Sequence, residues 1–107
     1  MSRSYELRVY TLASVEALET YRRVHYPRHL VSFLEYGIAA HGLWTNTDDQ
    51  PRLYALLSFA EGADPADVAQ RYLHSPELRA DMAGFDVSAI LEVTSTPLTP
   101  SPGSALL

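Results

Sequence analysis

The chain contains no cysteine and no lysine, and both absences restrict its chemistry. Without cysteine there is no disulfide, no thiolate nucleophile, no iron–sulfur cluster and no cysteine-ligated zinc. All eight basic residues are arginine, so a lysine Schiff base is excluded as well. Any catalysis must therefore use histidine, tyrosine, aspartate, glutamate, arginine, serine or threonine, or a bound cofactor.

Positive charge, glycine and long apolar runs are also scarce. The formal net charge is −5, which disfavours nucleic acid and anionic membranes because neutralising phosphates requires a basic surface. The few glycines form no phosphate-binding loop. No apolar run approaches the roughly 18 residues of a membrane span, and no secretory apolar region precedes the first strand-like segment. We therefore expect a cytoplasmic protein that binds neither nucleic acid nor membrane.

The remaining composition is typical of a globular domain. Hydrophobic residues make up 47% of the 107 residues and charged residues 20%. A chain of this length buries roughly two thirds of its unfolded surface, which is enough for a core without covalent cross-links. No linker, repeat or low-complexity block interrupts the chain, so residues 1–107 are predicted to form one domain.

The spacing of apolar residues predicts alternating strands and helices. The predicted elements are a strand at 5–12, a helix that starts after Ser14 and ends at Gly37, strands at 38–47 and 53–59, a helix from Asp64 to about His74, a short helical turn from Ser75 through Met82, and a last strand at 89–96. Pro27 lies inside the first helix and removes a backbone hydrogen bond there. We therefore expect a kink or break near residues 23–26.

This β-α-β-β-α-β order is typical of an α+β, ferredoxin-like fold, with two helices on one face of a four-stranded antiparallel sheet. The other face of that sheet stays bare in a single chain. The strands carry apolar or aromatic residues at both odd and even positions, which point to opposite faces of the sheet. The bare face is therefore predicted to be buried too. Sheet-to-sheet association of two copies would bury it, so we expect a homodimer.

Four separated segments resemble the NIPSNAP family, a branch of the dimeric α/β-barrel superfamily. They are Tyr5-Glu6-Leu7-Arg8-Val9-Tyr10-Thr11-Leu12; Pro27 followed by Gly37-Ile38; Gly42-Leu43-Trp44; and Leu98-Thr99-Pro100 with Ser104-Ala105-Leu106. The resemblance spans nearly the whole chain. It implies a homodimer whose two sheets meet as a barrel, with a pocket between sheet and helices. Relatives of the NIPSNAP family include cofactor-free monooxygenases, haem enzymes and plain binding proteins. By this resemblance, Ala55 stands where the family usually carries a histidine.

His25 and His29 are the first candidate site residues. They are four residues apart, so both can project from one helix face, as metal-binding histidine pairs do. No acidic third ligand stands at a recognisable spacing, and a metal site needs at least three protein groups. We therefore expect no metal and no cofactor. A polar pocket group or proton acceptor is the preferred role, because imidazole titrates near neutral pH.

Glu6, Arg8 and Tyr10 share one face of the first predicted strand. Arg8 could anchor a substrate carboxylate or enolate, with Tyr10 as a hydrogen-bond donor. Alternatively, Glu6 and Arg8 form a structural pair, either within one chain or across the expected dimer, because an isolated buried charge costs several kcal/mol. The structural pair is the preferred interpretation.

An aromatic pocket could be lined by Trp44, Tyr54, His41 and Tyr21. Aromatic residues at strand spacing are more often part of the core, however. Gly42, expected on the face of Trp44 together with Ala40, leaves space for a cavity there. His74, by contrast, is predicted to be a last-turn residue of its helix.

Three functions remain open. The first is a protein that binds, or acts on, a small apolar or aromatic molecule, by cofactor-independent oxygenation, isomerisation or cyclisation if it is catalytic. Its candidate pocket residues are Arg8, Tyr10, His25, His29, Trp44 and Tyr54. The second is a non-catalytic dimeric module without a pocket, and the third is a haem site with His25 or His29 as axial ligand. A void of a few hundred Å³ lined by histidine and tyrosine favours the first.

Overall fold

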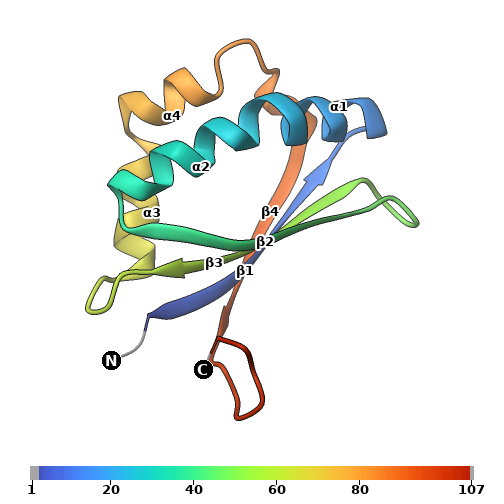
Figure 1. Ribbon diagram of the computed structural model, residues 1–107. Helices are drawn as coiled ribbons and strands as arrows, with labels where there is room; N and C mark the ends of the chain where they lie inside the picture. Colours follow the sequence, from blue (N-terminus) through green and yellow to red (C-terminus); the bar gives the residue numbers. More distant parts are fainter. Residues whose placement is uncertain (1–2, 107) are drawn as a thin grey trace.

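The computed structural model describes residues 3–106, which form an α+β fold with one sheet and helices on one side of it (Figure 1). Four strands make an antiparallel sheet in the order β2-β3-β1-β4. The strands are β1 (Ser4–Leu12), β2 (Ile38–Asn46), β3 (Arg52–Phe59) and β4 (Ile90–Leu98). The helices are α1 (Val15–Thr20), the π-helix η1 (Tyr21–His25), α2 (Tyr26–Glu35), α3 (Pro65–Leu73), α4 (Pro76–Asp81) and the short 3₁₀ helix η2 (Val87–Ala89). The predicted ferredoxin-like fold is confirmed.

Side-chain caps start the helices where the sequence predicts them. Ser14 accepts a hydrogen bond from the backbone N–H of Ala17 at 3.0 Å. Asp64 and Ser75 cap α3 and α4 in the same way, and each is followed by a proline in the first helical turn. These caps satisfy N–H groups that have no partner within the helix, and proline costs nothing where that N–H would be unpaired.

The expected break in the first helix takes the form of a π-helical turn. The backbone N–H of Tyr26 donates to the carbonyl of Tyr21, five residues back rather than four. Pro27, which has no N–H to donate, follows directly in the first turn of α2. The wider turn places Tyr21 and Tyr26 on the same side of the helix, and both are buried, at 2% and 0% exposure.

Strand register separates two faces of the sheet. On the helix-covered face, Tyr10 pairs with Leu53 and both are buried. On the opposite face, which we call the outer sheet face, Val9 pairs with Tyr54, and Tyr54 pairs with Trp44. Trp44 is 55% exposed there. No helix of residues 3–106 is both long and apolar enough to cross a membrane.

The two edge strands of the sheet, β2 and β4, are irregular. In β2 the register shifts between Ala40, which pairs with Leu57, and Gly42, which pairs with Leu56. Ala40 therefore faces the helices, and the expectation that it shares a face with Gly42 and Trp44 is wrong. In β4 the strand runs on through Pro97, beyond its predicted end at residue 96. Proline is tolerated there because β4 is an edge strand.

Candidate functional site

A cavity of about 480 Å³ lies between the helix-covered face of the sheet and α2, α3 and α4. Its apolar wall consists mainly of Phe33, Leu73, Leu78, Met82, Ile90 and Val93. Its polar groups come from both layers of the fold: Arg8 and Tyr10 from β1 in the sheet, and Tyr21, His29 and Tyr72 from the helices η1, α2 and α3. An apolar hollow with a few convergent polar groups is the usual form of a small-molecule site.

Three of these polar groups form a hydrogen-bonded chain with Asp81. The Tyr21 hydroxyl lies 3.1 Å from Nε2 of His29. Nδ1 of His29 contacts the Tyr72 hydroxyl, which donates to Oδ2 of Asp81 at 2.6 Å. Because the Tyr72 proton points to Asp81, the Tyr72 oxygen accepts from Nδ1–H of His29. In a neutral ring Nε2 then carries no proton and accepts from Tyr21.

Burial decides the protonation states of the hydrogen-bonded histidine and tyrosines. It lowers the pKa of His29 to about 4, and the hydrogen bond and charge of Asp81 offset only part of that effect. Burial also raises the pKa values of Tyr21 and Tyr72 well above the usual range for tyrosine. At neutral pH the imidazole and both phenols are therefore uncharged. Such an imidazole accepts hydrogen bonds but is a weak base for proton abstraction.

Glu6 and Arg8 form an ion pair at the edge of the cavity. Nη2 of Arg8 lies 2.7 Å from Oε2 of Glu6, and Nε donates to the same oxygen at 2.8 Å. Both side chains are 12% exposed. The expected pairing within one chain is therefore present, and it neutralises a guanidinium that burial could not leave alone.

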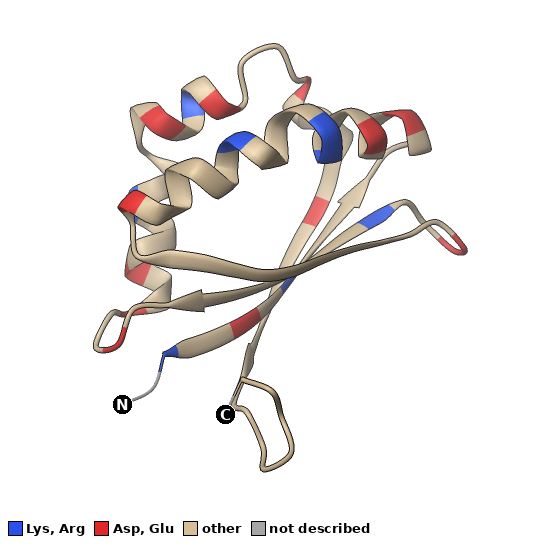
Figure 2. Cartoon of the chain, viewed as in Figure 1, with Lys and Arg blue, Asp and Glu red and all other residues tan. Residues whose placement is uncertain are grey.

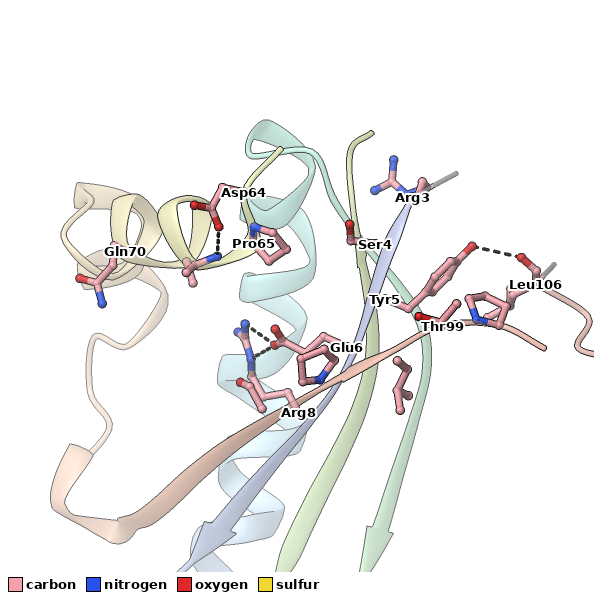
Figure 3. A pocket seen from close by; sticks show the side chains of 16 residues that line it. Arg3, Ser4, Tyr5, Glu6, Arg8, Asp64, Pro65, Gln70, Thr99 and Leu106 are labelled. Atoms are coloured by element: carbon pink, nitrogen blue, oxygen red, sulfur yellow. Dashed lines mark hydrogen bonds and ion pairs between the residues drawn. The ribbon is translucent and has the colours of Figure 1, made fainter. Parts of the chain in front are cut away.

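A second hollow, an open groove of about 1160 Å³, lies on the other side of Arg8 (Figure 3). It is lined by Glu6, Asp64 and Gln70 among others, and it shares Arg8, Ala69 and Ser95 with the inner cavity. Figure 3 shows the Glu6 and Arg8 side chains pointing toward each other on the α3 side of β1. Arg8 thus separates the outer groove from the inner cavity.

The family model described as NIPSNAP matches residues 5–105. The chain belongs to the NIPSNAP family. The resemblance drawn from the four sequence segments is thereby confirmed. A comparison with curated proteins gave no match.

Solved structures share the fold of this NIPSNAP chain at low sequence identity. An uncharacterized NIPSNAP domain protein from Burkholderia xenovorans gives a TM-score of 0.70 at 16% identity, over 92% of this chain and 95% of that one. A NIPSNAP family protein of unknown function from Agrobacterium tumefaciens gives 0.74 at 16% identity, over 99% and 95%. A dimeric ferredoxin-like protein from an uncultured marine organism gives 0.63 at 10% identity, over 94% and 91%. Likeness at these identities establishes the fold alone.

The structure brings together four of the six candidate pocket residues of this NIPSNAP chain. Arg8, Tyr10 and His29 line the inner cavity. His25 is buried beside them but does not line it; its Nδ1 donates to the backbone carbonyl of Asp81 at 2.9 Å. Trp44 and Tyr54 were also candidates, and they lie on the outer sheet face.

The expected aromatic pocket of Trp44, Tyr54, His41 and Tyr21 does not form, because the sheet lies between its members. Tyr21 lines the inner cavity, whereas Nε2 of His41 lies 2.7 Å from Oγ of Ser58 and its ring is tilted against that of Tyr5. The space over Gly42 is filled: a Cβ there would lie 2.3 Å from the Trp44 ring. The glycine therefore accommodates the indole and leaves no cavity.

Two further expectations can be placed on the structure. His74 ends α3, as predicted, and its Nδ1 donates to the carbonyl of Gln70 at 2.9 Å. Ala55, which the sequence resemblance places where the family usually has a histidine, is fully buried and pairs with Arg8. Within residues 3–106, no three histidine, aspartate or glutamate side chains form a cluster that could hold a metal ion. Basic and acidic residues are scattered over the helices, strands and loops (Figure 2).

Tyr72 and Asp81 were missed by the sequence reasoning. Asp81 offered a signal, because it is the last residue of α4, where the helix dipole disfavours a negative charge. It is nevertheless buried, at 7% exposure, and holds the hydroxyl of Tyr72. Tyr72 offered none, since its spacing on α3 is that of an ordinary core residue.

Proposed function

We propose that this NIPSNAP protein binds a small, mainly apolar molecule in the inner cavity. The observation that carries this proposal is the hollow of about 480 Å³ lined by Tyr10, Tyr21, His29 and Tyr72. Protein interiors are normally packed as densely as organic crystals, with few voids larger than a water molecule. Ligand sites, in contrast, occupy roughly 300–1,000 Å³ and combine apolar walls with a few fixed polar groups. A non-catalytic module without a pocket would need a filled space here.

The polar groups favour binding over proton transfer. His29 is held neutral by burial, with its pKa at about 4, so it is poorly suited to remove a proton at neutral pH. Tyr21 and Tyr72 are each committed to a hydrogen-bond partner in the chain that ends at Asp81. Fixed groups of this kind hold the shape of the cavity, so a ligand can bind without reorganising it, which preserves affinity.

We also propose that two copies associate through the outer sheet face. Half-buried or exposed apolar side chains follow three adjacent strands of that face, among them Leu7, Val9, Trp44, Tyr54 and Leu56. A second copy is the natural occupant, because a self-complementary sheet face gives a closed, symmetric pair. The dimeric ferredoxin-like neighbour with the same fold supports this choice.

Native mass spectrometry of the purified protein tests the binding proposal. We expect a mass in excess of the bare chain, or binding of an added bicyclic aromatic probe. Ala69→Phe should abolish both, because residue 69 lines the cavity and a phenyl ring would fill it. Ala80→Phe is the matched control on the exposed surface of α4. A bare mass in the wild type together with no probe binding would overturn the proposal.

A further inference from the structure

Most hydrogen-bond donors around the inner cavity are already committed. The Tyr21 proton points to His29, the His29 proton to Tyr72, and the Tyr72 proton to Asp81. A ligand must therefore obtain its main hydrogen bonds elsewhere on the cavity wall. The largest remaining source is the guanidinium of Arg8, which lines the same cavity and carries five N–H donors.

Glu6 uses only part of that guanidinium. It takes Nε and Nη2 of Arg8 through a single carboxylate oxygen. Within residues 3–106, the contacts of Glu6 with Arg8 involve Nε and Nη2 and not Nη1, so Glu6 leaves N–H groups of the guanidinium to other partners. Glu6 lines the outer groove but not the inner cavity, whereas Arg8 lines both. Arg8 thus reaches the inner cavity on a side that Glu6 does not line.

The positive charge of the Arg8 guanidinium is already balanced by nearby negative charges, although Glu6 does not contact all of its N–H groups. Glu6 supplies one negative charge at 2.7 Å, and Asp81 supplies another behind Tyr72. His29 contributes no compensating positive charge at neutral pH, because burial lowers its pKa to about 4. An acidic ligand at Arg8 would place a second carboxylate beside Glu6 in a poorly solvated site, where like charges repel strongly.

We propose that the cavity selects uncharged ligands that carry a carbonyl-type acceptor for Arg8, and that Glu6 excludes acids by occupying the anion position of that guanidinium. This inference rests on the proposed binding function and adds the ligand class to it. Glu6 then acts on specificity through repulsion, which is a common way of rejecting a close analogue. The Arg8 anchor for a substrate carboxylate, considered from the sequence, is replaced by an anchor for a neutral oxygen.

Three probes with the same bicyclic ring test the ligand class in the wild-type protein. They are naphthyl methyl ketone, naphthoate and ethylnaphthalene, which differ only in a neutral acceptor, a negative charge or neither. We expect the ketone to bind about tenfold more tightly than either of the others at pH 7.5, measured by calorimetry or ligand-observed NMR. Naphthoate binding as tightly as the ketone, or ethylnaphthalene doing so, would overturn the inference while leaving the binding function intact.

Glu6→Gln tests the role of Glu6 with a matched control. We expect the preference for the ketone over naphthoate to fall by about tenfold or to reverse, because Arg8 is then free to pair with the ligand carboxylate. Glu92→Gln, on an exposed position of β4, should leave the preference unchanged. An unchanged preference in Glu6→Gln would contradict the inference. If Glu6→Gln does not fold, the wild-type order of the three probes still decides.

The binding function and the ligand class can fail separately. If no probe binds but a compound is retained through purification, its charge decides: a neutral carbonyl compound supports the inference and an acid overturns it. If no probe binds and the protein carries no compound, the binding function itself fails, and the ligand class fails with it.

Discussion

Among single residues, His29 is a titratable group that the fold removes almost completely from water. It is 3% exposed, and both its ring nitrogens contact a tyrosine hydroxyl. Removing the imidazole from water disfavours its charged form, while Asp81 favours that form only partly. His29 therefore gives folding a pH dependence that an exposed histidine lacks.

We predict that His29 makes the protein less stable in mild acid. Its pKa is about 4 when folded, against 6.5 for the unperturbed group. Between these values the unfolded chain binds one more proton than the folded chain, so stability rises with pH and is lost as pH falls. The loss should be on the order of 3 kcal/mol by pH 4.

Chemical denaturation at pH 7, 5.5 and 4.5 measures this loss. His29→Gln keeps hydrogen-bonding capacity without a titratable ring, so it should flatten the slope relative to the wild type. His74→Gln, at an exposed position, should not. Equal slopes for the wild type and His29→Gln would count against the predicted role of burial.

Local pairing at the site could be predicted from sequence, but long-range pairing could not. The Glu6–Arg8 ion pair was expected because the two residues share one strand face, two positions apart. The contact between His29 and Tyr72 joins residues 43 positions apart, and no local spacing rule reports such a meeting. It depends on how α3 packs against α2, which tertiary contacts decide.

Among the elements, η1 sets which side chains reach the site. Its five-residue turn brings Tyr21 onto the same face as Tyr26 and His29. In a regular α-helix, residues 21 and 26 would point about 140° apart, given roughly 100° per residue. π-Helical turns often occur at functional sites, and Tyr21 lines the inner cavity.

We predict that deleting Arg23, an exposed residue of η1, converts this turn to regular α-helix and misplaces the helix before it. Leu18 and Tyr21 are both nearly fully buried, and their rotation should lower the free energy of unfolding by about 3 kcal/mol or more. Deleting Asp48, in the exposed loop between β2 and β3, is the control. Denaturation midpoints compare the two, and equal stabilities would show that the π turn is not required.

Element order could be read from the chain, whereas side-chain direction in β2 could not. Proline, glycine and cap residues such as Ser14 and Asp64 marked the boundaries correctly. The bulge between Ala40 and Gly42 shifts the alternation by one residue, and no proline or unusual composition announces it. The position of Trp44 relative to the inner cavity therefore had to come from the structure.

At the scale of the whole molecule, the two sheet faces differ in what covers them. The helices cover one face, while Trp44 at 55% exposure and Leu98 at 42% lie on the outer one. Monomeric proteins rarely expose contiguous apolar patches beyond a few hundred Å². The inner cavity lies on the helix-covered side of the sheet, so the proposed ligand and the proposed second copy would occupy opposite faces.

We predict that Trp44→Glu weakens the proposed homodimer by at least about thirtyfold, since a buried interface tryptophan contributes about 2 kcal/mol or more. Sedimentation at micromolar concentration should give the mass of two chains for the wild type and of one chain for the variant. Leu34→Glu, on the exposed surface of α2 at 71% exposure, should remain a dimer. A monomeric wild type would refute the prediction.

The irregular edge strands of the sheet disfavour the addition of further strands from other copies. A regular, exposed edge offers unpaired backbone groups to any other edge, and such pairing can continue without limit into fibrils. Here β2 is bulged at Ala40–Gly42 and β4 contains Pro97, which has no backbone N–H. Both edges of the sheet are therefore poor templates for strand addition. The proposed face-to-face contact would end at two copies, and the features that interrupt the strands would protect the protein against amyloid-like growth.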